Sequence, residues 1–175
     1  MNTLNVYTDG GCTNNGKKNA RCSIGIHFPK IYFPLEHFPN IKDISNLLKV
    51  NKSSNNVAEL TAIYECLKIL KENNIKSDIN IYSDSQYSIN CITKWYPNWV
   101  KKGIVKTKKN HELLTEIYNL YKEFNKTTFI YIKAHTGLHD EHSMGNSVAD
   151  ELASNPLKFE LKSKTKPNDI LNYFQ

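Results

Sequence analysis

Residues 4–11 read Leu4-Asn5-Val6-Tyr7-Thr8-Asp9-Gly10-Gly11. Apolar and β-branched side chains alternate along this run, a pattern typical of a β-strand. The strand is expected to stop at the two glycines, which leaves Asp9 as its last side chain. An Asp-Gly pair taken alone is typical of a hairpin turn. A carboxylate at the end of a strand is also well placed to hold a cation, provided that other carboxylates converge on it.

The chain has 175 residues, a length that fits one domain with a buried core. Its composition, 39% hydrophobic and 23% charged residues, is that of a folded globular protein and not of a disordered one. No run of 18 apolar residues and no basic-then-apolar N-terminal signal occurs, so neither a membrane span nor export is expected. We expect residues 1–157 to form the domain and residues 158–175 a polar tail.

The cysteines indicate the cellular compartment of the protein, and its net charge indicates the class of its partner. The four cysteines are scattered without a Cys-x-x-Cys pair, which predicts neither a disulfide framework nor a cysteine zinc site. An intracellular, reducing compartment, cytoplasmic or nuclear, is therefore expected. The net charge of +6 favours a polyanionic partner, nucleic acid first. The basic excess is concentrated in residues 101–109, which hold five lysines and no acid.

The order of the expected elements predicts an α/β fold with a mixed sheet and helices on its faces. Strands are expected at 4–11, 20–28, within 41–50, at 78–83 and at 127–134. Helices are expected from the caps at 53–56 to Glu72, at 85–93, at 111–124 and at 146–154, with a polar loop at 135–145. The first long helix carries one apolar stripe, formed by Leu60, Ile63, Tyr64, Leu67 and Leu70.

Carboxylates follow two of these strands. Asp84 comes directly after the strand at 78–83, as Asp9 follows the first. If the two strands are parallel neighbours, both side chains emerge at the same end of the sheet. Glu59 lies at the edge of the helical stripe, where it can lean over the sheet or simply complement the helix dipole. Asp150 and Glu151 are both candidates for a fourth carboxylate, and periodicity does not choose between them. Converging carboxylates repel one another without a cation, and oxygen-only ligands favour Mg²⁺ or Mn²⁺ over zinc.

Five blocks of sequence together resemble the signature blocks of type 1 ribonuclease H, in that family's order from about Leu4 to Ser154. They are Thr8-Asp9-Gly10-Gly11, Ser54-Asn55-Asn56-Val57-Ala58-Glu59-Leu60, Ser83-Asp84-Ser85-Gln86-Tyr87, Lys133-Ala134-His135-Thr136-Gly137 and Gly145-Asn146-Ser147-Val148-Ala149-Asp150-Glu151-Leu152-Ala153. The resemblance implies a ribonuclease H-like, five-stranded mixed sheet, its first three strands antiparallel, flanked by helices. It also favours Asp150 over Glu151.

The resemblance implies an endonuclease that hydrolyses the RNA strand of RNA/DNA hybrids. Asp9, Glu59, Asp84 and Asp150 would hold two Mg²⁺ ions, with Mn²⁺ as an alternative, for a two-metal-ion mechanism that yields 5′-phosphate and 3′-hydroxyl products. His135 matches the loop histidine that assists proton transfer or product release. The loop after it is longer than in familiar members, and its residues 139–142 read His-Asp-Glu-His. That run is interpreted as a solvated loop in preference to a transition-metal site.

Substrate contacts are likewise implied by the resemblance. Side-chain amides that can sense 2′-hydroxyl groups are Asn15, Asn55, Asn56 and Gln86, and Asn146 in the last block is also expected to contact substrate. An aromatic wall for the DNA strand is formed by Tyr87, Trp95 and Trp99, followed by Lys101 and Lys102 of a basic protrusion. A pocket for a DNA phosphate is assigned to Lys52, Ser54 and Asn110.

The sequence therefore predicts a monomeric ribonuclease H that binds RNA/DNA hybrid and no membrane. Because the chain starts at the first strand, we expect no separate hybrid-binding module before it and little processivity. The alternative is a non-catalytic hybrid- or double-strand-binding module, which would keep the lysines and tryptophans. Such a module need not keep Asp9, Glu59, Asp84 and Asp150 together, so the presence of all four carboxylates favours the enzyme.

Overall fold

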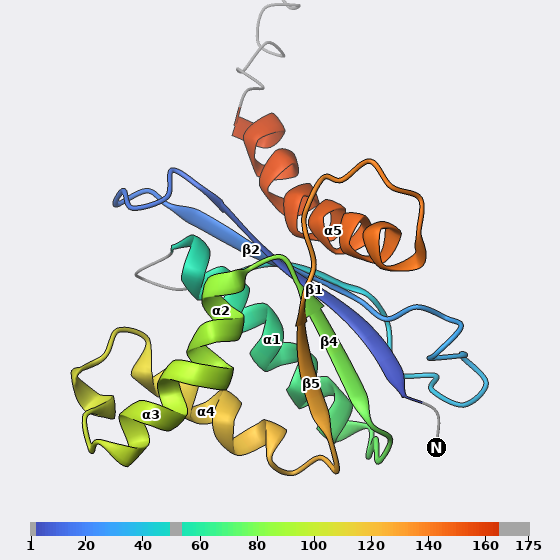
Figure 1. Cartoon of the computed structure of the whole chain (residues 1–175). Helices are drawn as coiled ribbons and strands as arrows, with labels where there is room; N and C mark the ends of the chain where they lie inside the picture. The colour runs from blue at the N-terminus through green and yellow to red at the C-terminus, as the bar shows by residue number, and fades with distance from the viewer. Residues whose placement is uncertain (1–2, 50–53, 165–175) are drawn as a thin grey trace, which may run out of the picture.

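The structure is a computed structural model that describes residues 3–49 and 54–164, with side chains described as far as residue 158. It confirms the predicted α/β class, because five strands form one mixed sheet in the order β3-β2-β1-β4-β5 (Figure 1). The strands are β1 (Leu4–Thr13), β2 (Arg21–His27), β3 (Ile44–Leu47), β4 (Ile79–Ser83) and β5 (Thr127–Tyr131). The first three are antiparallel neighbours, as predicted, whereas β1–β4 and β4–β5 are parallel pairs.

Helices cover both faces of this sheet (Figure 1). They are α1 (Asn55–Glu72), α2 (Gln86–Asn90), the π-helical turn η1 (Cys91–Trp95), α3 (Tyr96–Lys101), the 3₁₀ turn η2 (Val105–Thr107), α4 (His111–Tyr121) and α5 (Glu141–Lys164). The predicted stripe of α1 faces the core, where Leu60, Ile63 and Leu67 are fully buried. Helix α5 alone packs on the opposite face, against β1 and β2. Among the described residues, no helix combines the length and the apolar composition that a membrane crossing requires.

Strand β1 runs past its predicted end. Its antiparallel pairing with β2 continues to Thr13 opposite Arg21, but its parallel pairing with β4 ends at Thr8 opposite Ser83. The hairpin turn lies farther on, where Asn14 and Gly16 adopt positive φ angles. Asp9 is therefore not the last residue of a strand. It stands where β1 loses its β4 neighbour, so its side chain still reaches the carboxyl end of the parallel pair.

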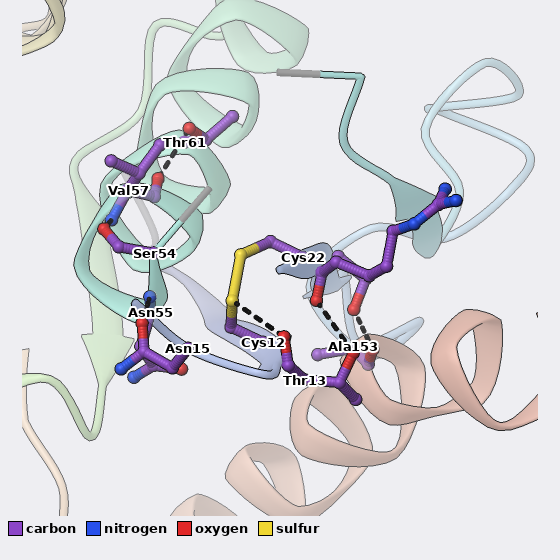
Figure 2. Close-up of a disulfide and its surroundings, with 11 residues drawn as sticks. Cys12, Thr13, Asn15, Cys22, Ser54, Asn55, Val57, Thr61 and Ala153 are labelled. Atoms are coloured by element: carbon purple, nitrogen blue, oxygen red, sulfur yellow. Dashed lines mark hydrogen bonds between the residues drawn. A yellow bond between two sulfur atoms is a disulfide. The ribbon is translucent and has the colours of Figure 1, made fainter. Parts of the chain in front are cut away.

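The expectation that no disulfide forms is wrong for one cysteine pair. Cys12 on β1 lies directly opposite Cys22 on β2, and the two are joined by a disulfide (Figure 2). Cys66 and Cys91 are free and buried. Spacing along the chain hid this pair, because the hairpin register, and not sequence proximity, brings the two residues together.

The last helix begins earlier and ends later than predicted. Asp140 caps it, because its Oδ1 accepts hydrogen bonds from the backbone N–H groups of His142 at 3.1 Å and Ser143 at 3.0 Å. Part of the expected loop at 135–145 is thus helical, and α5 extends to Lys164. Pro156 lies inside the helix and cannot donate to the carbonyl of Leu152. The Ser45 hydroxyl donates to that carbonyl instead, at 2.7 Å, which ties the helix to β3.

Candidate active site

Three carboxylates from distant parts of the chain meet at the carboxyl ends of β1 and β4. Asp9, Glu59 and Asp84 each offer an oxygen, and these oxygens lie within 4.8 Å of one another. The pairing of Thr8 with Ser83 is the last of the parallel ladder, so the acids that follow these two residues leave the strands at the same level. The structure therefore brings together three of the four predicted acids as one tight cluster.

Glu59 reaches this cluster because α1 approaches β1 very closely. Ser54 caps the helix by accepting a hydrogen bond from the Val57 backbone N–H at 3.3 Å. In the second turn, the helix backbone passes directly over Gly10: a Cβ atom built there would lie 2.3 Å from the backbone nitrogen of Glu59. Only a residue without a side chain permits this approach. The glycine beside Asp9 thus places Glu59 over the strand.

The cluster is buried and electrostatically strained. Asp9 is 6% exposed and Glu59 4%. Burial, followed by the negative charges of Asp84 and Asp150, raises the pKa of Asp9 to about 7. Burial and the charge of Asp9 raise the pKa of Glu59 well above its ordinary value, and burial and the charge of Asp150 raise that of Asp84. Asp150, on α5, is not in the tight group but is close enough to act on two of its members.

These residues fit a hard divalent cation. Glu59 Oε2 is buried and has no hydrogen-bond partner among the described residues, so its desolvation is uncompensated. The ion pairs found in the described part of the chain use other acids, namely Asp43, Glu65 and Glu123. Oxygen donors alone are the preferred ligands of Mg²⁺ and Mn²⁺. A bound Mg²⁺ or Mn²⁺ ion would balance the negative charge of these carboxylates.

The metal-free protein is expected to lose stability as the pH rises. Because the pKa of Asp9 is raised from 3.8 to about 7, its contribution is full below pH 4 and is lost as the pH passes through 7. The free energy of unfolding, measured by urea titration in EDTA, should fall between pH 5 and pH 8 by an amount on the order of 2–4 kcal/mol. Millimolar Mg²⁺ should restore it at pH 8 and change little at pH 5.

Asp9→Asn is the control for this titration, because it removes the group whose pKa is raised to about 7. The variant should show a flatter pH dependence in EDTA and a smaller stabilisation by Mg²⁺ at pH 8. If wild type and Asp9→Asn lose the same free energy between pH 5 and pH 8, the acidic cluster is not the source of the effect.

His135 faces the acidic cluster from the loop after β5. Its backbone has a φ angle of 51°, and its charge lowers the pKa of Asp84, so the ring lies near that carboxylate. His135, Asn146 and Asp150 line one cavity of about 210 Å³. Asn146 is 4% exposed, and its Oδ1 has no partner among the described residues. The structure thus places these three predicted residues around a single hollow.

The amides expected to sense 2′-hydroxyl groups lie on the outside of the same edge. Asn15 Oδ1 accepts a hydrogen bond from the Asn55 backbone N–H at 3.1 Å, which joins the β1–β2 turn to the start of α1 (Figure 2). Asn15, Asn55, Asn56 and Gln86 are all exposed. The Cys12–Cys22 disulfide lies between this contact and α5 (Figure 2). The turn that carries Asn15 is therefore held at both of its strands.

The predicted aromatic wall forms one continuous surface. Trp95 stacks on Trp99 with ring centroids 6.4 Å apart, and Tyr87 meets Trp95 edge-on at 5.8 Å. Trp95 is 39% exposed, whereas Tyr87 and Trp99 are half-buried and pack against the hydrophobic core. Lys108 lies over the ring of Trp99 at 5.7 Å, and Lys101 and Lys102 are exposed nearby in the chain. The arrangement joins flat aromatic faces to cationic side chains.

The phosphate pocket is described only in part. Ser54 is the cap of α1, and Asn110 begins α4 with a φ angle of 59°. Lys52, the third predicted member, lies outside the described residues.

The sequence analysis missed an aromatic cluster beside the acids. Tyr7 and Tyr82 stand two residues before Asp9 and Asp84 on paired strands, and their rings stack at 5.0 Å. The signal was present as a repeated pattern, Tyr-Thr-Asp at 7–9 and Tyr-Ser-Asp at 82–84. Side chains two residues apart on a strand share a face, so each tyrosine lies on the same side of the sheet as its acid.

The mixed sheet, the helices on its two faces and the buried acids between β1 and β4 define an α/β protein with a carboxylate site able to hold a divalent ion. Within that class, the family model described as RNase H matches residues 1–158. The chain therefore belongs to the ribonuclease H family, as the resemblance predicted.

Individual relatives agree with this assignment. A ribonuclease H of Clostridium botulinum is 37% identical over 142 residues, which cover 78% of this chain and 86% of that protein. A probable ribonuclease H of Acanthamoeba polyphaga mimivirus is 34% identical over 157 residues, and the match spans 86% of this chain but 64% of the viral protein. A foamy viral protease-reverse transcriptase, solved in complex with RNA/DNA hybrid, shares the fold with a TM-score of 0.62 at 19% identity, over 87% of this chain and 19% of that one.

Proposed function

We propose that this protein is an endonuclease that hydrolyses the RNA strand of RNA/DNA hybrids. The observation that carries the proposal is the buried cluster of Asp9, Glu59 and Asp84, with Asp150 beside it, in a chain of the ribonuclease H family. A module that only bound hybrids would gain nothing from burying three mutually repelling carboxylates, since their repulsion destabilises the fold unless a cation compensates it.

The four acids are proposed to hold two Mg²⁺ ions, or Mn²⁺ in their place. The chemistry that such a pair supplies is activation of a water molecule and stabilisation of the leaving 3′-oxygen, which gives 5′-phosphate and 3′-hydroxyl products. Asp84, Asp150 and Glu59 all act on the pKa of Asp9, so Asp9 interacts with each of the other acids and is the proposed shared ligand. His135, across the cavity from Asp150, is proposed to carry a proton to or from the reacting phosphate.

Recognition of the hybrid is proposed to divide between the two sides of the acidic cluster. The amides of Asn15, Asn55, Asn56 and Gln86 can donate to and accept from a 2′-hydroxyl group, which DNA lacks. The aromatic wall and the lysines beyond it provide sequence-independent contact for the DNA strand. Asn146 is proposed to contact the RNA strand from the cavity, and Ser54, Asn110 and Lys52 a DNA phosphate. Binding through lysines should weaken steeply with salt.

A direct assay tests the function. End-labelled RNA/DNA hybrid, duplex RNA and duplex DNA are incubated with the protein, with Mg²⁺ or with EDTA, and the products are sized and tested for a 5′-phosphate. We expect internal cleavage of the RNA strand of the hybrid, only with Mg²⁺, and intact duplexes. Tight binding of the hybrid without cleavage, in Mg²⁺ and in Mn²⁺, would instead support the alternative of a non-catalytic binding module.

A further inference from the structure

The run His139-Asp140-Glu141-His142 has a structural role that neither interpretation of the sequence, a solvated loop or a transition-metal site, predicted. None of its four residues belongs to the group of three potential metal ligands found among the described residues, which is Asp9, Glu59 and Asp84. It is also more than a solvated loop. Asp140 caps α5, and the Tyr32 hydroxyl donates a hydrogen bond to Glu141. His142 points the other way, onto the sheet.

His142 contacts both members of the tyrosine pair, Tyr7 and Tyr82, through its ring and through its two ring nitrogens. Its ring stacks on Tyr82 with centroids 4.5 Å apart and an interplanar angle of 20°. Its Nδ1 lies 2.9 Å from the Tyr7 hydroxyl oxygen, a hydrogen bond. The phenol can donate its proton to the imidazole. One histidine thus joins β1 and β4 to the first turn of α5.

The same helix face continues from His142 to the acidic cluster. One turn on, Gly145 rests on the Tyr7 ring, since a Cβ atom built there would lie 2.5 Å from Tyr7 Cε2. Ala149, a further turn along, is fully buried against the tyrosine pair. Asp150 follows it directly. An α-helix is stiff over two turns. The contacts of His142 with the tyrosine pair therefore determine how close α5 brings Asp150 to Asp9 and Asp84.

Something must hold Asp150 there. Asp150 lies close to Asp9 and Asp84, and carboxylates that converge without a cation repel one another. The second attachment of α5 lies past Asp150, where Ser23 donates to the Ala153 carbonyl and Ser45 to that of Leu152. Among the described residues, His142 is the polar attachment of α5 to β1 and β4 on the near side.

We propose that His142 is a positioning residue for the metal site. Through its contacts with the tyrosine pair it keeps Asp150 beside Asp9 and Asp84 before a cation binds. The inference deepens the proposed function and rests on it only in taking these acids as the metal ligands. His142 touches neither substrate nor cation. It acts through Asp150, and its effect should appear in the affinity of the free protein for metal.

The test is a Mn²⁺ titration of the hybrid-free protein by isothermal titration calorimetry. His142→Ala should weaken Mn²⁺ binding about tenfold, the usual cost of removing a group that orients a metal ligand. His142→Phe keeps the stack on Tyr82 and loses the hydrogen bonds to the hydroxyl groups of Tyr7 and, at 3.5 Å, of Tyr82, so it should weaken binding less. His139→Ala, in the same run but exposed, should bind Mn²⁺ as the wild type does. In cleavage assays, His142→Ala should need more Mg²⁺ while the KM for hybrid stays unchanged.

A double variant distinguishes a positioning role of His142 from a general packing role. If His142 acts through Asp150, then adding His142→Ala to Asp150→Asn should not weaken Mn²⁺ binding further. An equal loss in both backgrounds, or unchanged Mn²⁺ affinity in a folded His142→Ala protein, would reduce His142 to a packing residue. Where urea titration shows that His142→Ala is unfolded, His142→Phe and Tyr7→Phe carry the comparison. Because no hybrid is present, the result stands apart from whether the protein cleaves RNA.

Discussion

Asp84→Asn is expected to lower the rate of hybrid cleavage by at least about a thousandfold, equivalent to about 4 kcal/mol of transition-state stabilisation. The change removes one negative charge from the site that should hold two divalent ions, but it keeps the size of the side chain. Single-turnover cleavage of a labelled hybrid measures the loss. Affinity for the hybrid, measured by fluorescence anisotropy in Ca²⁺, should change little, because the aromatic wall and the lysines are untouched.

Asp78→Asn is the matched control, since Asp78 stands immediately before β4 and Asp84 immediately after it. The same chemical change at the opposite end of one strand should leave cleavage at the wild-type rate. Normal cleavage by Asp84→Asn would remove Asp84 from the catalytic site.

His135→Ala should slow turnover without stopping it, because the residue is proposed to move a proton and not to hold the ions.

Gly10→Ala is expected to destabilise the fold by about 3 kcal/mol or more. The added methyl group would lie 2.3 Å from Glu59 N and 2.5 Å from the carbonyl carbon of Ala58. Both are backbone atoms of α1, so no side-chain rotation relieves the clash, and the helix must move off the sheet. Urea unfolding monitored by circular dichroism measures the loss. Any protein that remains folded should also bind Mn²⁺ more weakly, because Glu59 moves with the helix.

Gly11→Ala is the control for this substitution, one residue along the same strand but facing α5. Its methyl group would meet Leu157 Cδ1 at 3.1 Å and Ser23 Oγ at 3.2 Å, both of which are side-chain atoms that can shift. A loss of about 1 kcal/mol is expected there. Equal stability of Gly10→Ala and the wild type would mean that α1 does not approach β1 as closely as described.

Much of the fold could be predicted because local pattern and final structure agree. The alternating strands, the stripe of α1 and the acids after two strands each follow from side-chain period alone. The end of β1 could not be predicted in this way, because it depends on which neighbour continues: β2 pairs to Thr13, whereas β4 stops at Thr8. The pairing of Cys12 with Cys22 likewise depends on the hairpin register.

The start of α5 shows a different limit. Residues 141–145 read Glu-His-Ser-Met-Gly, a mostly polar stretch that ends in a glycine and is typical of a loop. They are helical because Asp140 caps them and because the tyrosine pair offers His142 and Gly145 a surface. A proline normally ends a helix. Pro156 is tolerated because the Ser45 hydroxyl donates to the Leu152 carbonyl, which Pro156 leaves without a backbone donor. The Asp140 cap is local, but the contacts of His142, Gly145 and Ser45 join segments more than a hundred residues apart, so local propensity does not reveal them.

The parallel register of β1 and β4, closed by α5, has a consequence for the protein during its synthesis. Asp9 emerges from the ribosome first, but its partner strand follows some seventy residues later and Asp150 only near the end of the domain. A nascent chain that stops before residue 150 therefore has no complete acidic site, however well its hairpin has formed. The acidic site is therefore completed last, and an unfinished polypeptide that is still attached to its messenger should not yet bind divalent ions there.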